Sequence, residues 1–138
     1  MRGSTFTNQA GVKRDCGEAS LTMTVAMIRD LKPLCHTAAQ TADGATKFVV
    51  CAANVTSGPS AGSRLDLGTA LIMSGFAFAS IGPNGKAVHE PYLVAQLLAQ
   101  KKRSGLWAFA DTPDPNQIIL QALRRQPTAP APAPPAPR

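Results

Sequence analysis

The sequence predicts an α+β fold for one domain, and three observations lead to this prediction. Apolar residues recur with helical spacing in residues 16–31 and 90–104. Residues 47–55 are rich in Val and Ala and include a Phe, which favours a strand. The last residues are almost all proline and alanine and cannot belong to a core. We therefore divide the chain into an irregular lead-in over residues 1–14, one domain over residues 15–125 and a disordered Pro/Ala-rich tail over residues 126–138.

The first expected helix covers residues 16–31. Asp15 followed by Glu18 has the spacing of a capping box, which satisfies free backbone N–H groups at a helix start. Lys32-Pro33 should end the helix, because the residue before a proline is pushed out of the α region. The apolar positions at helical spacing should form its buried stripe, namely Leu21, Val25 and Ile28, widened by Met27 and Leu31.

A β-hairpin is expected to follow this helix. Residues 34–37 and 47–55 form its strands, and Asp43-Gly44 lies in the polar stretch between them. If the turn is a three-residue loop, Cys35 faces Cys51 directly across the strands, at a spacing that a disulfide can bridge. The alternative is that both are compact buried thiols in a reducing compartment, and the sequence leaves the two readings open.

The second half of the sequence predicts three more helices. Their ranges are residues 65–74 closing on Gly75, residues 90–104 closing on Gly105, and residues 115–125, with a short strand expected at residues 76–81. In the helix over residues 90–104 the pattern divides the side chains into two sets. We expect Val94, Leu97 and Leu98 to be buried, and Gln96, Gln100, Lys101 and Arg103 to face water.

The formal net charge is +6, which favours polyanions as partners. Basic residues cluster only at Lys13-Arg14, at Lys101, Lys102 and Arg103, and at Arg124-Arg125. The middle cluster is either a solvated helix face or a phosphate contact. No apolar stretch is long enough to span a membrane, and residues 1–12 lack the apolar region of a signal peptide. As written, the chain is expected in the cytoplasm, or in a secreted or periplasmic location if a signal precedes it.

Motifs for catalysis or metal binding are not found. The carboxylates are dispersed one at a time, so no calcium or magnesium site is predicted. Cys16, Cys35, His36 and Cys51 lack a CxxC pair, and the adjacent Cys35-His36 should point to opposite sheet faces, which argues against zinc. Cys16 at a helix N-terminus is a conceivable reactive thiol, but no base is tied to it.

Two blocks of the second half carry a family resemblance. Residues 65–79 read LDLGTALIMSGFAFA, and Tyr92 is followed by Gly105-Leu106-Trp107. This order resembles the second half of the thermonuclease (staphylococcal-nuclease-like) family, where L-x-x-x-L-(V/I)-x-x-G-x-A precedes Y-x-x-A-x-x-x-A-x-x-x-(R/K)-x-G-L-W. Cys16-Gly17-Glu18-Ala19 is similar to the opening of that family's first helix. The resemblance covers residues 16–107, about two-thirds of the chain.

The resemblance implies a partial OB-like barrel, made of a β-hairpin plus three helices, with the family's first three barrel strands missing. Family members hydrolyse nucleic-acid phosphodiesters with calcium, using two aspartates, a glutamate and two arginines. Most of these groups lie in the first three strands, and nothing before Asp15 matches them. Lys47 stands near the position of the second arginine, where a lysine cannot form a bidentate phosphate clamp. Gln96 and Gln100 stand where the family commonly has Glu and Arg.

These residues leave three functions open. The first is a truncated, non-catalytic thermonuclease-like domain with weak nucleic-acid binding through Lys47, Lys101, Lys102 and Arg103. The second is a calcium-dependent secreted nuclease whose true start lies upstream, and no cofactor other than that calcium is expected. The third is a protein-interaction module that uses the tail or an exposed sheet edge. A barrel without three strands leaves an open edge and bare helix faces, so a partner chain that completes the sheet is also expected.

Overall fold

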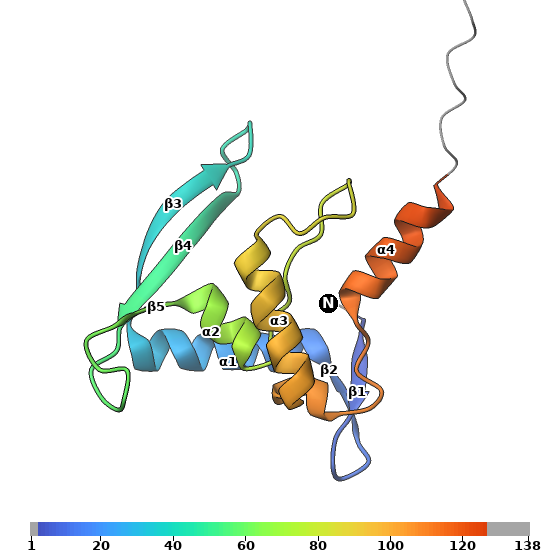
Figure 1. Cartoon of the computed structure of the whole chain (residues 1–138), viewed down its shortest axis with the longest axis horizontal. Coiled ribbons are helices and arrows are strands. Elements are labelled where there is room, and N and C mark those ends of the chain that lie inside the picture. The colour runs from blue at the N-terminus through green and yellow to red at the C-terminus, as the bar shows by residue number, and fades with distance from the viewer. Residues whose placement is uncertain (1–2, 127–138) are drawn as a thin grey trace, which may run out of the picture.

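The computed structural model describes residues 3–126 and confirms the α+β class. Within these residues the chain forms two small antiparallel sheets, four α-helices and one 3-10 helix. Figure 1 shows a two-stranded arm leaning away from the helices on one side and the last helix extending on the other. From residue 127 onward, the expected Pro/Ala-rich tail lies outside the described residues.

Residues 5–15 form a β-hairpin, so the prediction of an irregular lead-in over residues 1–14 is wrong for this part. Strands β1 (Thr5–Thr7) and β2 (Lys13–Asp15) pair antiparallel. The Asn8 side chain organises the turn, because its Oδ1 accepts hydrogen bonds from the N–H groups of Ala10 and Val12. Strands of three residues are too short to show a period of two, and for that reason the sequence pattern did not reveal them.

Helix α1 (Cys16–Leu31) begins and ends where the sequence predicts. The Asp15 carboxylate caps it by accepting a hydrogen bond from Glu18 N–H at 2.8 Å. Lys32 ends it in the left-handed conformation, with a φ of 46°, just before the proline. The hairpin before α1 is fixed to the far end of the chain by Asp111, whose carboxylate accepts hydrogen bonds from the N–H and Oγ1 of Thr7.

The β-hairpin predicted over residues 34–37 and 47–55 is present and forms the arm, and its first strand is longer than expected. Strand β3 (Leu34–Gln40) pairs antiparallel with β4 (Lys47–Asn54), and β4 pairs with the short β5 (Arg64–Asp66). Cys35 lies opposite Cys51, and the register shifts by one residue between Thr37 and Ala39. Every residue of β3 is exposed, and the arm rises above α1 and α2 in the upper left part of Figure 1.

The centre of the fold is the contact between α2 (Leu67–Met73) and α3 (Glu90–Lys102), followed by the 3-10 helix η1 (Gly105–Ala108) and α4 (Pro115–Arg125). Gly75 and Gly105 let the end of α2 and the start of η1 meet backbone to backbone. Leu106 of η1 then packs with Phe6 and Cys16 in one buried cluster. The short strand expected at residues 76–81 is wrong, because this segment makes only one isolated bridge, Ile81 to Ala87.

The predicted burial of α3 is inverted for its large apolar residues and for Gln96, whereas Lys101 and Arg103 are exposed as expected. Gln96 is only 2% exposed and lies inside with Ala95 and Ala99, whereas the large apolar residues Val94, Leu97 and Leu98 face outward. Small residues on the inner face allow α3 to approach α2 closely, and Gln96 is tolerated because its side-chain oxygen accepts two hydrogen bonds. The stripe predicted for α1 is likewise uncovered, since Leu21, Val25 and Ile28 are all exposed.

Candidate binding surfaces

The buried Gln96 joins three segments that are distant in the sequence. Its Oε1 accepts hydrogen bonds from Ala79 N–H at 2.8 Å and from Asn116 Nδ2 at 3.1 Å. Beside it, Gln100 donates to the Asp114 carboxylate, which also caps α4. Gln96 and Gln100 were expected to face water, but they link α3 to α4 and to the segment after α2. These residues therefore stabilise the fold and offer no free catalytic group.

The carboxylate of Asp66 accepts three hydrogen bonds, more than any other carboxylate of the described residues. It caps α2 by accepting hydrogen bonds from the N–H and Oγ1 of Thr69, and it accepts a third from the Tyr92 hydroxyl at 2.9 Å. Burial pushes the pKa of Asp66 upward, but the three hydrogen bonds outweigh it, and the pKa lies below its usual value. Gly68 makes this contact possible, because a Cβ there would lie 2.7 Å from the Tyr92 ring carbon Cζ.

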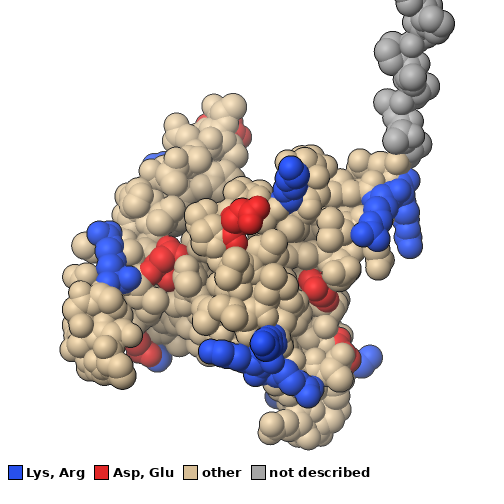
Figure 2. All heavy atoms as spheres, in the orientation of Figure 1, with Lys and Arg blue, Asp and Glu red and all other residues tan. Residues whose placement is uncertain are grey.

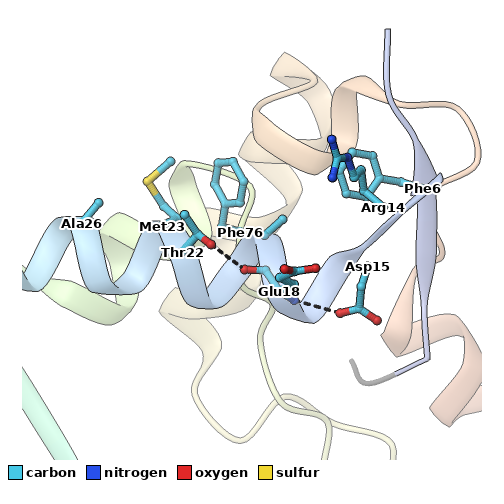
Figure 3. Close-up of a pocket in the computed structure, with 9 residues that line it drawn as sticks. Phe6, Arg14, Asp15, Glu18, Thr22, Met23, Ala26 and Phe76 are labelled. Atoms are coloured by element: carbon cyan, nitrogen blue, oxygen red, sulfur yellow. Dashed lines mark hydrogen bonds between the residues drawn. The ribbon is translucent and has the colours of Figure 1, made fainter. Parts of the chain in front are cut away.

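A groove of about 410 Å³ lies beside α1 (Figure 3). Phe6, Met23 and Phe76 give it apolar walls, and the charged side chains of Arg14 and Glu18 stand at its margin. Asp15 also lines it, but its carboxylate is already used to cap α1. This size and lining are those of a site that accepts an apolar side chain or a small apolar molecule.

The cations proposed from the sequence do not form one surface. Lys101, Lys102 and Arg103, which we call the basic cluster, lie together at the C-terminal end of α3, and Figure 2 shows blue side chains gathered there. Lys47 begins β4 at the tip of the arm, well away from that end of α3 in Figure 1. Among residues 3–126 the one ion pair joins Arg29 to Asp30, so the basic cluster has no carboxylate partner in this part of the chain.

The three cysteines have different environments. A disulfide joins Cys35 to Cys51 across the arm, with a Cα–Cα distance of 4.0 Å. Cys16 is fully buried against Phe6 and Leu106. Burial raises the pKa of the Cys16 thiol, and the charges of Asp15 and Asp111 raise it further. The hypothesis that Cys16 is a reactive thiol is therefore wrong, because the Cys16 side chain is inaccessible and its thiol is protonated at neutral pH.

Large apolar side chains are left uncovered on three elements. They belong to the outer stripe of α1, to the outer stripe of α3 and to the arm, and their members are Leu21, Val25 and Ile28, then Val94, Leu97 and Leu98, then Leu34, Phe48, Val49 and Val50. Leu21 is 64% exposed, Leu97 56% and Leu34 79%. Such stripes are ordinarily the buried faces of their elements, and uncovered apolar surface of this extent is typical of interaction surfaces.

No group of three or more His, Cys, Asp or Glu side chains within residues 3–126 is arranged to hold a metal ion. In the same residues no helix combines the length and apolar character needed to cross a membrane. Comparisons of the chain with protein-family models, with curated proteins and with solved structures find no match.

Proposed function

We propose that this chain is a non-catalytic protein-binding domain that presents apolar faces to another polypeptide. The observation that supports this function is the outward stripe of α3. Leu97 is 56% exposed, while Ala95 and Ala99 on the opposite side of the same helix are buried. A large apolar residue contributes about 1.5–3 kcal/mol when it leaves water, so covering the three residues of this stripe would favour binding of a partner.

We further propose that the scaffold is thermonuclease-like and that it corresponds to part of an OB barrel. The residues that carry the resemblance contact one another, since Gly75 meets Gly105, Leu106 fills the core beside Cys16, and Tyr92 bonds to Asp66. In a complete barrel of that family, further strands would pack on these elements. In this proposal a second polypeptide takes their place on the uncovered faces.

The test is to purify the tagged full chain from its native source and to compare it with the variant Leu97→Glu. We expect a companion polypeptide at fixed stoichiometry, identified by mass spectrometry, which the variant loses. Gln121→Glu is the matched control, because it makes the same change of charge at an exposed polar position of α4. The proposal is wrong if Leu97→Glu and the native chain have the same companions and the same hydrodynamic mass.

The basic cluster supports a second function, which is weak binding of nucleic acid. Three consecutive cations with no carboxylate partner among the described residues are free to contact phosphates. The opposing explanation is that cations at a helix C-terminus only complement the helix dipole. Fluorescence anisotropy with a labelled single-stranded DNA separates the two explanations.

In that assay, replacing all three cations with alanine should weaken binding and lower the slope of log K against log salt by about 2. Lys47→Ala is the control, because it removes a cation at the distant tip of the arm and should leave the slope unchanged. Binding that survives the triple replacement excludes the basic cluster as the nucleic-acid site.

A further inference from the structure

The outward face of α3 changes character along the helix axis. Val94, Leu97 and Leu98 form its apolar stripe, and they are between 43% and 56% exposed. Glu90 lies four residues before Val94 and Lys101 lies seven residues after it, so helical spacing places both on the same face as the stripe. This face therefore begins with a carboxylate, continues with apolar side chains and ends with a cation.

The charged groups at the two ends of this face have no partner of opposite charge. Glu90, Lys101 and Lys102 are all exposed. The one ion pair formed within residues 3–126 lies in α1, so these three groups are unpaired in the described part of the chain. Arg103 follows them but ends the helix in the left-handed conformation, so helical spacing no longer fixes its direction. Lys101 and Lys102 are therefore the cations that a partner on this face would meet.

A helix is the kind of segment that can cover this face. An extended peptide laid on the three apolar residues would leave its own N–H and C=O groups without partners on the side that faces α3. A helix satisfies these groups internally, and its side chains can fit between those of α3. With 13 residues, α3 is about 20 Å long, which matches a partner helix of about three to four turns.

Charge sets the direction of that helix. Helices favour Asp and Glu in the first turn and Lys and Arg in the last turn, because these charges complement the helix dipole. A helix that runs antiparallel to α3 places its acidic first turn beside Lys101 and Lys102, and its basic last turn beside Glu90. A parallel helix would place like charges together at both ends. The antiparallel direction is therefore the one that the charges of α3 favour.

Resting on the proposed function, we propose that the partner segment on α3 is an amphipathic helix with an acidic first turn, which packs antiparallel to α3. Its apolar side chains, spaced at i, i+3, i+4 and i+7, cover Val94, Leu97 and Leu98.

An anionic membrane is the competing occupant of this face, because basic amphipathic helices also bind lipid surfaces. Such helices are rich in Lys and Arg on the polar face that lies opposite their apolar side chains. In α3 the basic residues stand at one end of the apolar stripe, and the acidic Glu90 stands at the other end. This distribution of charge along the axis favours a protein helix over lipid.

The probes for the test are two fluorescein-labelled peptides of about 14 residues, each held helical by a side-chain lactam. Both have the apolar stripe and a basic last turn. The first turn contains Asp and Glu in one peptide and Asn and Gln in the other. By fluorescence anisotropy, the full chain with its disulfide intact should bind the acidic peptide at least roughly tenfold more tightly, because each exposed ion pair adds a modest amount. Added salt should reduce this difference.

Variants identify the groups that produce this preference. The double variant Lys101→Glu, Lys102→Glu should lose it, because the acidic first turn then meets carboxylates. Arg124→Glu, Arg125→Glu is the matched control, since it makes the same change of charge at two exposed cations of the last turn of α4 and should keep the preference. Leu97→Glu should weaken the binding of both peptides, because it places a charge within the stripe.

Zero-length carbodiimide cross-linking tests the direction, because it joins only an amine and a carboxylate that are in contact. We expect Lys101 or Lys102 to be joined to the first turn of the acidic peptide, and Glu90 to be joined to a lysine of its last turn. Cross-links from Glu90 to the first half of the peptide would overturn the antiparallel packing. If the double variant does not fold, these cross-links and the preference of the native chain decide the question.

Three other results overturn the inference. They are equal binding of the two peptides, a preference that the double variant retains, and no binding of either peptide. In each case the companion test with Leu97→Glu still decides the proposed function by itself. Vesicles of equal parts phosphatidylserine and phosphatidylcholine test the competing occupant. If the native chain binds them, and Leu97→Glu and the double variant do not, this face belongs to a membrane and the inference is wrong.

Discussion

The close approach of α2 and η1 depends on Gly75 and gives a prediction about stability. Gly75 has a φ of +80°, a conformation that residues with a Cβ rarely adopt. A Cβ at this position would lie 2.6 Å from the carbonyl carbon of Ser104 and nearer still to its oxygen. These are backbone atoms, so they cannot rotate aside as a flexible side chain can. We therefore expect Gly75→Ala to destabilise the protein strongly.

The size of this effect can be divided into two parts. Holding an L-residue in the left-handed conformation costs about 1–2 kcal/mol. Forcing extra volume into a packed site costs about 1–3 kcal/mol more, which gives a total loss of roughly 2–5 kcal/mol. Gly58→Ala is the matched control, because Gly58 has nearly the same φ of +82° but a Cβ added there would meet no atom within 4 Å. Gly58→Ala should therefore lose only the free energy that the left-handed conformation costs.

The assay is equilibrium unfolding in urea, followed by far-UV circular dichroism, on the native chain and both variants with the disulfide intact. We expect the free energy of unfolding to fall by roughly 1–3 kcal/mol more for Gly75→Ala than for Gly58→Ala. Equal losses in the two variants, within roughly 0.5 kcal/mol, would refute the reasoning, since they would mean that Ser104 does not approach this closely.

Three further changes test the buried contacts. Gln96→Leu should lower the free energy of unfolding by about 2–4 kcal/mol in urea, because the Asn116 amide and a backbone N–H lose their acceptor. Asp66 has a lowered pKa, so its stabilisation is complete above about pH 5 and is lost as the pH falls through that pKa; Asp66→Asn should flatten the acid limb of a stability–pH curve. Reducing the Cys35–Cys51 disulfide should cost about 3 kcal/mol, and hydrogen exchange should show the loss in the arm before it reaches α2 and α3.

The sequence predicted elements well where local chemistry specifies them. Asp15 caps α1, Pro33 limits it, and Gly75 ends α2, since each acts through groups within a few residues of itself. The alignment of Cys35 with Cys51 was expected from a three-residue loop, but the loop runs between Thr41 and Thr46, and the one-residue register shift between Thr37 and Ala39 restores the expected alignment. The hairpin before α1 was not expected, because its strands have only three residues each and Thr7 is held by Asp111, about one hundred residues away.

The failure at α3 has a different cause. A periodic stripe shows that one face of a helix is apolar. It does not show whether that face is covered by another segment of the same chain or by a second polypeptide. Within the chain, α3 uses the small residues Ala95 and Ala99 to approach α2, and this close packing turns Leu97 outward. Gln96 could follow them inward only because Ala79 and Asn116 supply donors, and nothing in the sequence marks those partners.

The outward apolar stripes of α3 and α1 bear on the proposed function. If the outward face of α3 were ordinary solvent-exposed surface, its composition would be mostly polar. Instead Val94, Leu97 and Leu98 keep the pattern of a buried face, and Leu21, Val25 and Ile28 repeat it on α1. Apolar stripes that face outward on two helices are consistent with a chain that buries these stripes against a partner polypeptide. Under the proposed function, the periodicity correctly identified buried faces, and the polypeptide that buries them is a partner.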